Sequence, residues 1–213
     1  MKATLAILAH ESAQPTIDDF LPQWKKLDCN LVVFLPKGHK VEGFRQQFYQ
    51  GENAYSGRKV FERFLQCCET LNLMRSELYI IAEYDTVNLS NDLPQHQSGY
   101  ITSNFILADG IKTSTGTQLC ALSPWVMDYM MLKRFIEAGR KYIEGDGDAP
   151  HMGGLLDRWI GSVIQRAELP HVTPFNMIGY PWHPGIEDRI KNVGATWVHG
   201  FKLRKEFGTA WTG

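Results

Sequence analysis

Two carboxylates with one residue between them follow an apolar run near the middle of the chain. Residues 78–82 (LYIIA) are hydrophobic throughout and lead into Glu83, Tyr84 and Asp85. Such a run is typical of a strand that is buried on both faces of a parallel or mixed sheet. Side chains alternate along an extended chain, so Glu83 and Asp85 are expected to point the same way. Neighbouring carboxylates repel each other, and a divalent cation carrying a diphosphate would relieve that repulsion.

The place of this pair in the chain predicts a ligand-binding role. In open α/β sheets, ligands bind outside the carboxyl ends of the strands, which is where Glu83 and Asp85 fall. We therefore predict that the pair holds Mg2+ or Mn2+ together with a diphosphate. The tripeptide alone leaves a structural interpretation equally open, in which Asp85 caps the following turn and Glu83 pairs with a lysine.

The residues before this pair predict an α/β fold. Residues 2–9 (KATLAILA) and 31–35 (LVVFL) are strand-like, and residues 16–27 between them carry apolar side chains at helical spacing. A strand, a helix and a strand in this order form a βαβ unit, which is right-handed in nearly all cases. Residues 41–57 are polar, and residues 51–57 among them predict a loop. Residues 58–73 predict the helix that leads into the central strand.

The residues after the pair predict further strands and helices. Residues 100–107 indicate a strand, and residues 120–122 indicate a short one. Ser123 and Pro124 then predict the start of a helix that runs to about Ile143, with Ser123 as its N-cap and Pro124 at its first position.

A glycine-rich acidic stretch separates this helix from the next one. Residues 144–154 (EGDGDAPHMGG) predict a mobile loop by their composition, which could close over a bound ligand and exclude water. The helix that Gly154 opens has an apolar stripe, and Asp157 and Arg158 fall in its first turn.

Composition excludes several classes of protein. The 213 residues are 44% hydrophobic and 21% charged, which is ordinary for one globular domain. The formal net charge of −1 gives no overall basic field for nucleic acid or membranes. The four cysteines include no C-x-x-C pair, and there is neither a signal peptide nor a long apolar span. We expect a soluble cytoplasmic protein without a transmembrane segment.

Four features in this order resemble the GT-A fold of nucleotide-sugar-dependent glycosyltransferases. They are the N-terminal βαβ unit, the E-x-D at a strand end, the D-R-W-I-G that starts a late helix and the terminal W-V-H-G-F-K. The resemblance implies a single Rossmann-like domain over residues 1–213, with a mixed, mostly parallel sheet flanked by helices. Residues 1–110 would be the nucleotide-sugar-binding half and residues 111–213 the acceptor-binding half. The family usually has aspartate where this chain has Glu83.

The resemblance also implies roles for single residues. Mn2+ or Mg2+ would be bound by Asp85 and His199, with Glu83 beside the metal and the diphosphate. Asp157 would be the catalytic base that takes a proton from the acceptor hydroxyl. The remaining donor-binding residues would be Ala9, His10 and Glu11 at the nucleoside, and Arg58 and Lys202 at the phosphates. The expected donor is a UDP-sugar.

Structural explanations compete with these roles. His199 is explained equally well as an ordinary core or surface histidine, and Asp157 as an acidic residue favoured by the helix dipole. Lys202 is one of several basic residues near the end of the chain, and Arg58 is explained as a solvated arginine at a helix start.

Two other functions stay open at this point. A non-catalytic nucleotide- or sugar-binding module would bind the same ligands without turnover. A nucleotidyltransferase would share the sheet and the metal carboxylates, but it normally has a glycine-rich phosphate loop with a lysine after the first strand. The sequence AHESAQPTIDD has neither feature.

The acceptor that the resemblance implies would be a sugar, a glycan, a lipid-linked glycan, a protein or a nucleobase. The chain is similar in kind to small phage-type enzymes that glycosylate hydroxymethylated pyrimidines in DNA. Phe175, Tyr180, Trp182 and the basic tail would suit an extruded base and a phosphate backbone. Aromatic residues suit sugar rings equally well.

Overall fold

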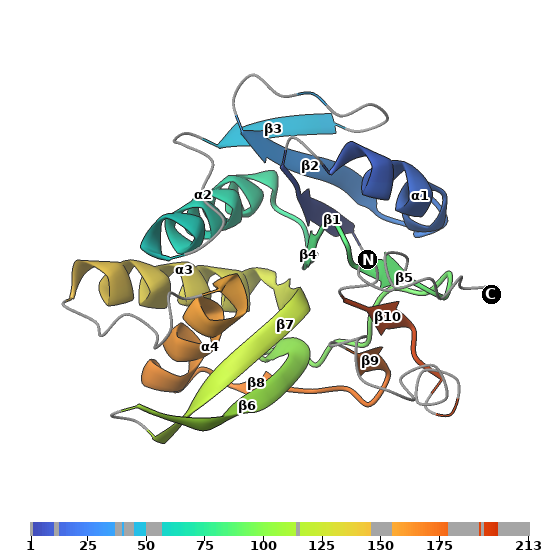
Figure 1. Ribbon diagram of the computed structural model, residues 1–213. Coiled ribbons are helices and arrows are strands. Elements are labelled where there is room, and N and C mark those ends of the chain that lie inside the picture. Colours follow the sequence, from blue (N-terminus) through green and yellow to red (C-terminus); the bar gives the residue numbers. More distant parts are fainter. Residues whose placement is uncertain are drawn as a thin grey trace.

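The computed structural model describes residues 2–10, 13–36, 40, 45–49, 57–113, 116–145, 155–178, 192 and 194–199. A mixed seven-stranded sheet forms the centre of this α/β fold (Figure 1), with the strand order β3-β2-β1-β4-β7-β6-β8. These strands are β1 (Ala3–Leu8), β2 (Asn30–Pro36), β3 (Arg45–Tyr49), β4 (Leu78–Glu83), β6 (Ile101–Thr113), β7 (Gly116–Asp128) and β8 (His171–Val172). The structure confirms the predicted α/β class with a mixed, mostly parallel sheet flanked by helices.

Strand direction places the carboxyl ends of β1 and β4 side by side. β1 pairs in parallel with both β2 and β4, and β2 pairs in parallel with β3. Strand β7 runs antiparallel to its neighbours β4 and β6. The last residues of β1 and β4, Leu8 and Glu83, are partners in the ladder, so the predicted acidic pair follows a strand that ends at the edge where β1 ends.

Helices cover both faces of the sheet. Helices α2 (Arg58–Met74), α3 (Tyr129–Glu144) and α4 (Leu156–Arg166) lie on one face, where Tyr79 and Ile81 of β4 belong to the same core. Helix α1 (Gln14–Trp24) lies on the other face with Ile80 of β4. Alternate residues of β4 thus enter two separate cores. This explains the unbroken apolar run of that strand.

A small second sheet lies against the α1 core. Its order is β5-β10-β9, formed by β5 (Val87–Asn88), β10 (Trp197–Val198) and β9 (Met177–Ile178). β10 pairs antiparallel with β5 and parallel with β9. Figure 1 shows these strands beside the carboxyl end of β4, so residues late in the chain return to the site predicted at its middle.

One strand was not predicted, and one predicted helix start was wrong. Residues 45–49, described from the sequence only as polar, form β3, which pairs only with β2 among the described strands. Its polar residues suit an edge strand, which has no apolar run to reveal it. Ser123 and Pro124 do not start the predicted helix, because they lie inside the long strand β7. Helix α3 begins at Tyr129, with the Asp128 carboxylate as its N-cap.

None of the helices in the described part of the chain combines the length and the apolar character needed to cross a membrane.

Candidate metal centre

The acidic pair lies on a tight turn that leaves β4. The backbone N–H of Tyr84 donates to the Leu8 carbonyl at 3.0 Å, so the turn stays attached to β1. The N–H of Thr86 donates to the Glu83 carbonyl at 2.9 Å, which closes the turn before β5 begins. These bonds hold Asp85 at the carboxyl edge of the sheet.

The small sheet delivers a histidine to the same turn. Val198 of β10 is the ladder partner of Val87 in β5, and His199 directly follows β10. The His199 N–H donates to the Ile178 carbonyl of β9 at 2.9 Å, which fixes the backbone beyond the ladder. Pairing of three two-residue strands therefore brings His199 to Asp85.

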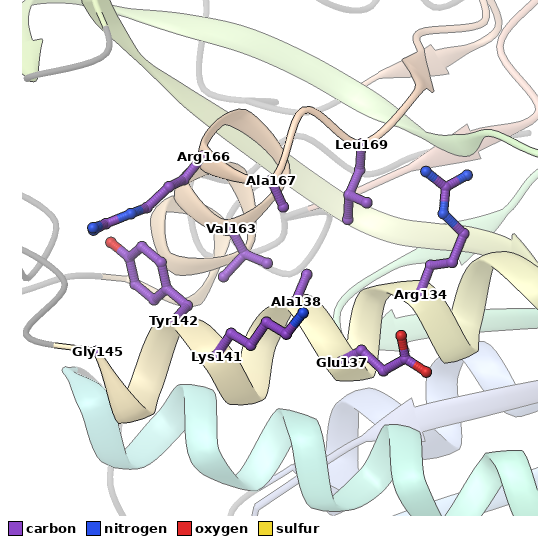
Figure 2. Close-up of a pocket in the computed structure, with 10 residues that line it drawn as sticks. All are labelled: Arg134, Glu137, Ala138, Lys141, Tyr142, Gly145, Val163, Arg166, Ala167 and Leu169. Carbon is purple, nitrogen blue, oxygen red and sulfur yellow. The ribbon is translucent and has the colours of Figure 1, made fainter.

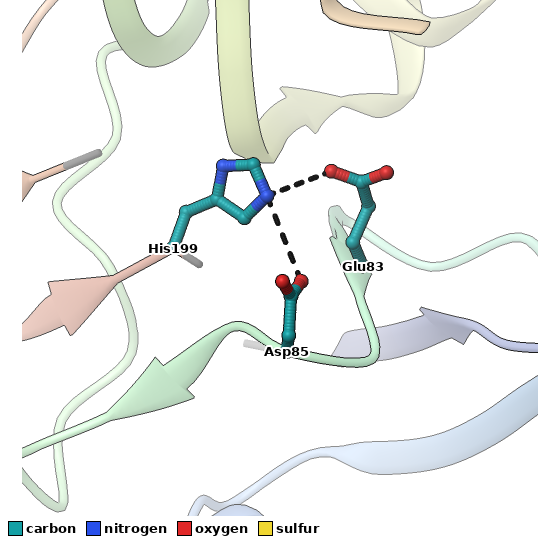
Figure 3. A group of neighbouring side chains, drawn as sticks. All are labelled: Glu83, Asp85 and His199. Atoms are coloured by element: carbon teal, nitrogen blue, oxygen red, sulfur yellow. Dashed lines mark ion pairs between the residues drawn. The ribbon is translucent and has the colours of Figure 1, made fainter. Parts of the chain in front are cut away.

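The side chains of Glu83, Asp85 and His199 converge (Figure 3). His199 Nε2 lies 2.8 Å from Glu83 Oε2 and 3.6 Å from Asp85 Oδ1. One ligand atom from each residue lies within 4.8 Å of the others. The three side chains are between 16% and 30% exposed, so they are accessible to a ligand and still partly shielded from water.

The carboxylates change the proton affinity of His199. Burial by itself would lower the pKa of this imidazole. The hydrogen bond that His199 donates to Glu83 and the charges of Glu83, Asp85 and Asp157 act in the opposite direction and raise the pKa of His199 to about 9. The imidazole therefore bears a proton at neutral pH and bridges two carboxylates. A divalent cation bound at this site would take the place of this proton between His199 Nε2 and the two carboxylates.

Asp157 belongs electrostatically to the same cluster. It lies in the first turn of α4 and is 8% exposed. Burial and then the Glu83 charge raise its pKa, against the N–H and charge of Arg158 and the charge of His199, which lower it. The charges of Glu83 and His199 act on the pKa of Asp157, and the charge of Asp157 acts on the pKa of His199, so Asp157 lies within electrostatic range of these two residues. A shifted carboxyl group in such a cluster is a candidate acid or base.

A glycine in α4 allows this helix to pack close to the sheet, which brings Asp157 into electrostatic range of Glu83 and His199. Gly161 packs on β7, where a Cβ atom would overlap the Leu119 carbonyl. Gln165 holds the far end of the helix to the same strand by donating to the Thr117 carbonyl at 3.0 Å. Helix α4 is thus fixed along β7, and Asp157 lies in its first turn.

The triad suits a divalent cation of the Mg2+ and Mn2+ class. Carboxylate oxygens are the preferred ligands of both ions, and an imidazole nitrogen favours Mn2+ over the harder Mg2+. Three neighbouring ligand atoms leave further coordination positions for water or phosphate oxygens. The donor set and its spacing could therefore hold a divalent metal ion, and Mn2+ or Mg2+ stays a prediction.

The end of β1 contributes a ring beside the acidic turn. Ala9 is buried, and its N–H donates to the Phe34 carbonyl of β2 at 3.0 Å. The rings of His10 and Tyr84 meet edge to face, with centroids 4.5 Å apart. The predicted nucleoside-binding segment thus contacts the residue between Glu83 and Asp85. Its third member, Glu11, lies outside the described residues.

Of the two predicted phosphate-binding residues, Arg58 and Lys202, the structure describes only Arg58. Arg58 lies at the start of α2 and pairs with Glu62 on its own helix at 2.8 Å. Lys202, Tyr180 and Trp182 fall outside the described part of the chain, and Phe175 is 72% exposed.

A hollow of about 420 Å3 lies away from the triad residues, between α3 and α4 (Figure 2). Arg134, Lys141 and Arg166 contribute cations to its lining, and Glu137 is the single carboxylate. Basic side chains are favoured near helix C-termini, which explains Lys141 and Arg166. A lining of this charge does not suit a metal cation, so the triad is the candidate site.

Three residues of the site escaped the sequence-based prediction. Tyr84 was treated only as the spacer between two carboxylates, although an aromatic residue after a buried strand is a signal for a ring contact. Thr86 and Ser123 form a buried hydrogen bond behind the turn, at 2.7 Å between their hydroxyl oxygens. Ser123 was missed because Ser-Pro resembles a helix start.

Compared with models of protein families and with curated proteins, the chain matches none.

Proposed function

We propose that this chain is a metal-dependent glycosyltransferase that moves a sugar from a nucleoside-diphosphate sugar to an acceptor hydroxyl. One observation carries the proposal: Glu83, Asp85 and His199 converge at the carboxyl edge of an α/β sheet, and the buried carboxylate of Asp157 interacts electrostatically with Glu83 and His199. A cation site for the diphosphate and a base for the acceptor are the two functional parts that the reaction requires.

The site residues divide this chemistry between them. Asp85, His199 and Glu83 would hold Mn2+ or Mg2+, which as a Lewis acid supplies stabilisation of negative charge on a leaving diphosphate. The His10 and Tyr84 rings, which contact each other edge to face beside the acidic turn, would contact the nucleoside attached to that diphosphate. Lys202 is retained as a predicted diphosphate contact.

Asp157 suits the role of general base. Its proton affinity is raised above that of an ordinary carboxylate by burial and by the Glu83 charge. A carboxylate with raised proton affinity accepts a proton more readily from an acceptor hydroxyl, provided the hydroxyl lies within hydrogen-bond reach. A base acting directly on the acceptor implies inversion at the anomeric carbon.

The donor class proposed is a UDP-sugar. The acceptor proposed is a glycan, a free sugar or a hydroxymethylated pyrimidine in DNA, because a ring-shaped acceptor would suit aromatic residues such as Phe175.

The test combines ligand binding with turnover. The melting temperature of the purified chain is measured with UDP, GDP, CDP and their sugars, each with and without Mn2+, and donor hydrolysis or transfer is followed for any ligand that binds. We expect one nucleotide to raise the melting temperature only when Mn2+ is present, because ligands of the folded state stabilise it by mass action.

Asp85→Ala should abolish both the shift and turnover, whereas Asp92→Ala, at an exposed position, should leave both unchanged. Turnover by Asp85→Ala without metal would refute the proposal. Metal-dependent binding without any turnover would instead favour a nucleotide- or sugar-binding module.

A further inference from the structure

A serine from a neighbouring strand holds the turn that carries the acidic pair. Ser123 of β7 is 1% exposed, and its Oγ accepts a hydrogen bond from the Glu83 backbone N–H at 2.9 Å. The same Oγ lies 2.7 Å from the hydroxyl of Thr86, so one of the two hydroxyls donates to the other. Ser123 therefore contacts the first and the last residue of the turn, with Asp85 between them.

The Ser123 side chain makes this contact just beyond the ladder between the two strands. The antiparallel ladder of β4 and β7 runs from the Leu78–Asp128 pair to the Ile81–Trp125 pair. The Glu83 N–H, at the end of β4, donates to the Ser123 hydroxyl.

The far end of the turn is held from the opposite face of the sheet. The Trp24 indole N–H of α1 donates to the Thr86 carbonyl at 3.1 Å, and both residues are completely buried. The Thr86 N–H closes the turn on the Glu83 carbonyl. With its backbone fixed in this way, Thr86 offers its hydroxyl to Ser123 from one defined position.

We propose that Ser123, acting with Thr86, is a positioning residue for the cation. The pair holds the backbone of the Glu83–Thr86 turn so that the Glu83 and Asp85 carboxylates can share one ion with His199. Partners that orient metal ligands in this manner contribute to affinity without touching the metal. The inference rests on the proposed function insofar as it requires a cation at the triad.

The experiment measures Mn2+ affinity directly, from the electron paramagnetic resonance signal of free Mn2+ titrated with protein. Ser123→Ala leaves the Glu83 N–H and the Thr86 hydroxyl without their partner. We expect Mn2+ affinity to fall by about 10- to 100-fold, as is typical when a partner of a metal ligand is removed. Circular dichroism melting confirms that each variant is folded at the temperature of the titration.

Ser103→Ala is the matched control. Ser103 of β6 is also completely buried, and its hydroxyl donates to the carbonyl of Leu122, the residue before Ser123. This substitution removes a buried serine hydroxyl from the same sheet without removing a contact to the turn. We expect it to lower the melting temperature and to leave Mn2+ affinity unchanged.

A second pair of variants tests the other hydroxyl. Thr86→Val keeps the shape of the side chain and removes the hydroxyl, so Mn2+ affinity should fall in the same direction. Thr86→Ser retains the hydroxyl and should restore most of the affinity. This pair decides the question if Ser123→Ala does not fold.

The outcomes separate this inference from the proposed function. If the wild-type chain shows no Mn2+ binding that depends on Asp85, the proposed function is refuted and positioning with it. If the wild-type chain binds Mn2+, and the variants Ser123→Ala and Thr86→Val bind it equally well, the positioning role is refuted and the proposed function is not. An equal loss of affinity in Ser103→Ala would also refute it, because the effect would then be general loosening of the sheet.

Discussion

At the scale of single residues, the site contains three carboxylates in different environments. Glu83 shares a proton with His199, Asp85 faces the same imidazole, and Asp157 is buried in the first turn of a helix. The charges of all three raise the pKa of His199, and that of Glu83 also raises the pKa of Asp157. Environments that separate the proton affinities of neighbouring acids allow one group to bind a cation while another takes up a proton.

Asp157→Asn tests the role of the base. The amide keeps the size of the side chain and an oxygen that can accept from the Arg158 N–H, now at 2.9 Å from Asp157 Oδ1. It cannot take up the acceptor proton, so we expect kcat to fall by about 100- to 10,000-fold. Mn2+ and donor affinity should change little, since the triad is intact.

The comparison is between kcat and the Mn2+ dissociation constant of the same preparation. A variant that keeps full kcat would exclude Asp157 as the base. A variant that loses Mn2+ affinity as much as Asp85→Ala would instead make Asp157 a further metal ligand.

At the scale of elements, the carboxylate of Asp128 fixes the junction between β7 and α3. It accepts hydrogen bonds from the Met131 N–H at 2.8 Å and the Gly99 N–H at 2.7 Å. Burial alone would raise the pKa of Asp128. The Met131, Gly99 and Ser98 hydrogen bonds and the His96 charge outweigh burial, so the pKa lies below its usual value of 3.8.

The Asp128 N-cap should make the free energy of unfolding fall as the pH is lowered into the acid range. A carboxylate whose pKa is lower in the folded state stabilises the protein above its unfolded pKa, and the contribution is lost as pH falls through the folded pKa. We expect Asp128→Ala to lower the free energy of unfolding by about 1–2 kcal/mol at pH 7, as for other lost N-caps. The difference from wild type should shrink below about pH 4.

Urea unfolding between pH 7 and pH 3 measures this effect, with Asp128→Asn as the control. Asparagine is also a good N-cap but does not titrate. The difference in free energy of unfolding between Asp128→Asn and Asp128→Ala should therefore depend less on pH than the difference between wild type and Asp128→Ala. A difference between wild type and Asp128→Ala that stays constant down to pH 3 would contradict the assignment.

Elements with a strong local pattern were predictable from the sequence. The apolar run of β4 and the amphipathic residues of α2 define these elements within a few residues, because burial dictates their side chains directly. Ser123 and Pro124 show where local preference fails. Both favour a helix start, but strand pairing on either side of β7 outweighs that preference.

The approach of His199 to the acidic pair could not be derived from periodicity. It depends on pairing between β5 and β10, each of which has two residues and hence no detectable pattern. The position of Asp157 could not be derived from periodicity either, because it depends on the close packing of Gly161 on β7. The resemblance to a family named these residues, whereas the sequence by itself left structural explanations equally open.

At the scale of the whole molecule, the candidate metal centre joins the large and small sheets. Glu83 ends a strand of the large sheet, whereas His199 follows a strand of the small one. A cation bound by both would therefore link β4 to β10. Binding of the ion to the folded state disfavours any local opening that would break the site.

Hydrogen exchange would reveal this link without any substrate. The Leu89 N–H donates to the Thr196 carbonyl, and the His199 N–H donates to the Ile178 carbonyl, so both amides report on the small sheet. We expect Mn2+ to slow their exchange because opening of the small sheet would detach His199 from the ion. At 100 times its dissociation constant, a ligand adds about 2.7 kcal/mol against such an opening, which corresponds to roughly 100-fold slower exchange.

The Ala167 N–H, bonded to the Val163 carbonyl at the end of α4, is the internal reference. It lies in an element whose last turn does not contribute a ligand, so its exchange should respond less to Mn2+. The same experiment on Asp85→Ala should show no effect of Mn2+ at Leu89 or His199. If Mn2+ slows exchange at Ala167 as much as at His199, the ion stabilises the fold as a whole and does not act as a link between the two sheets.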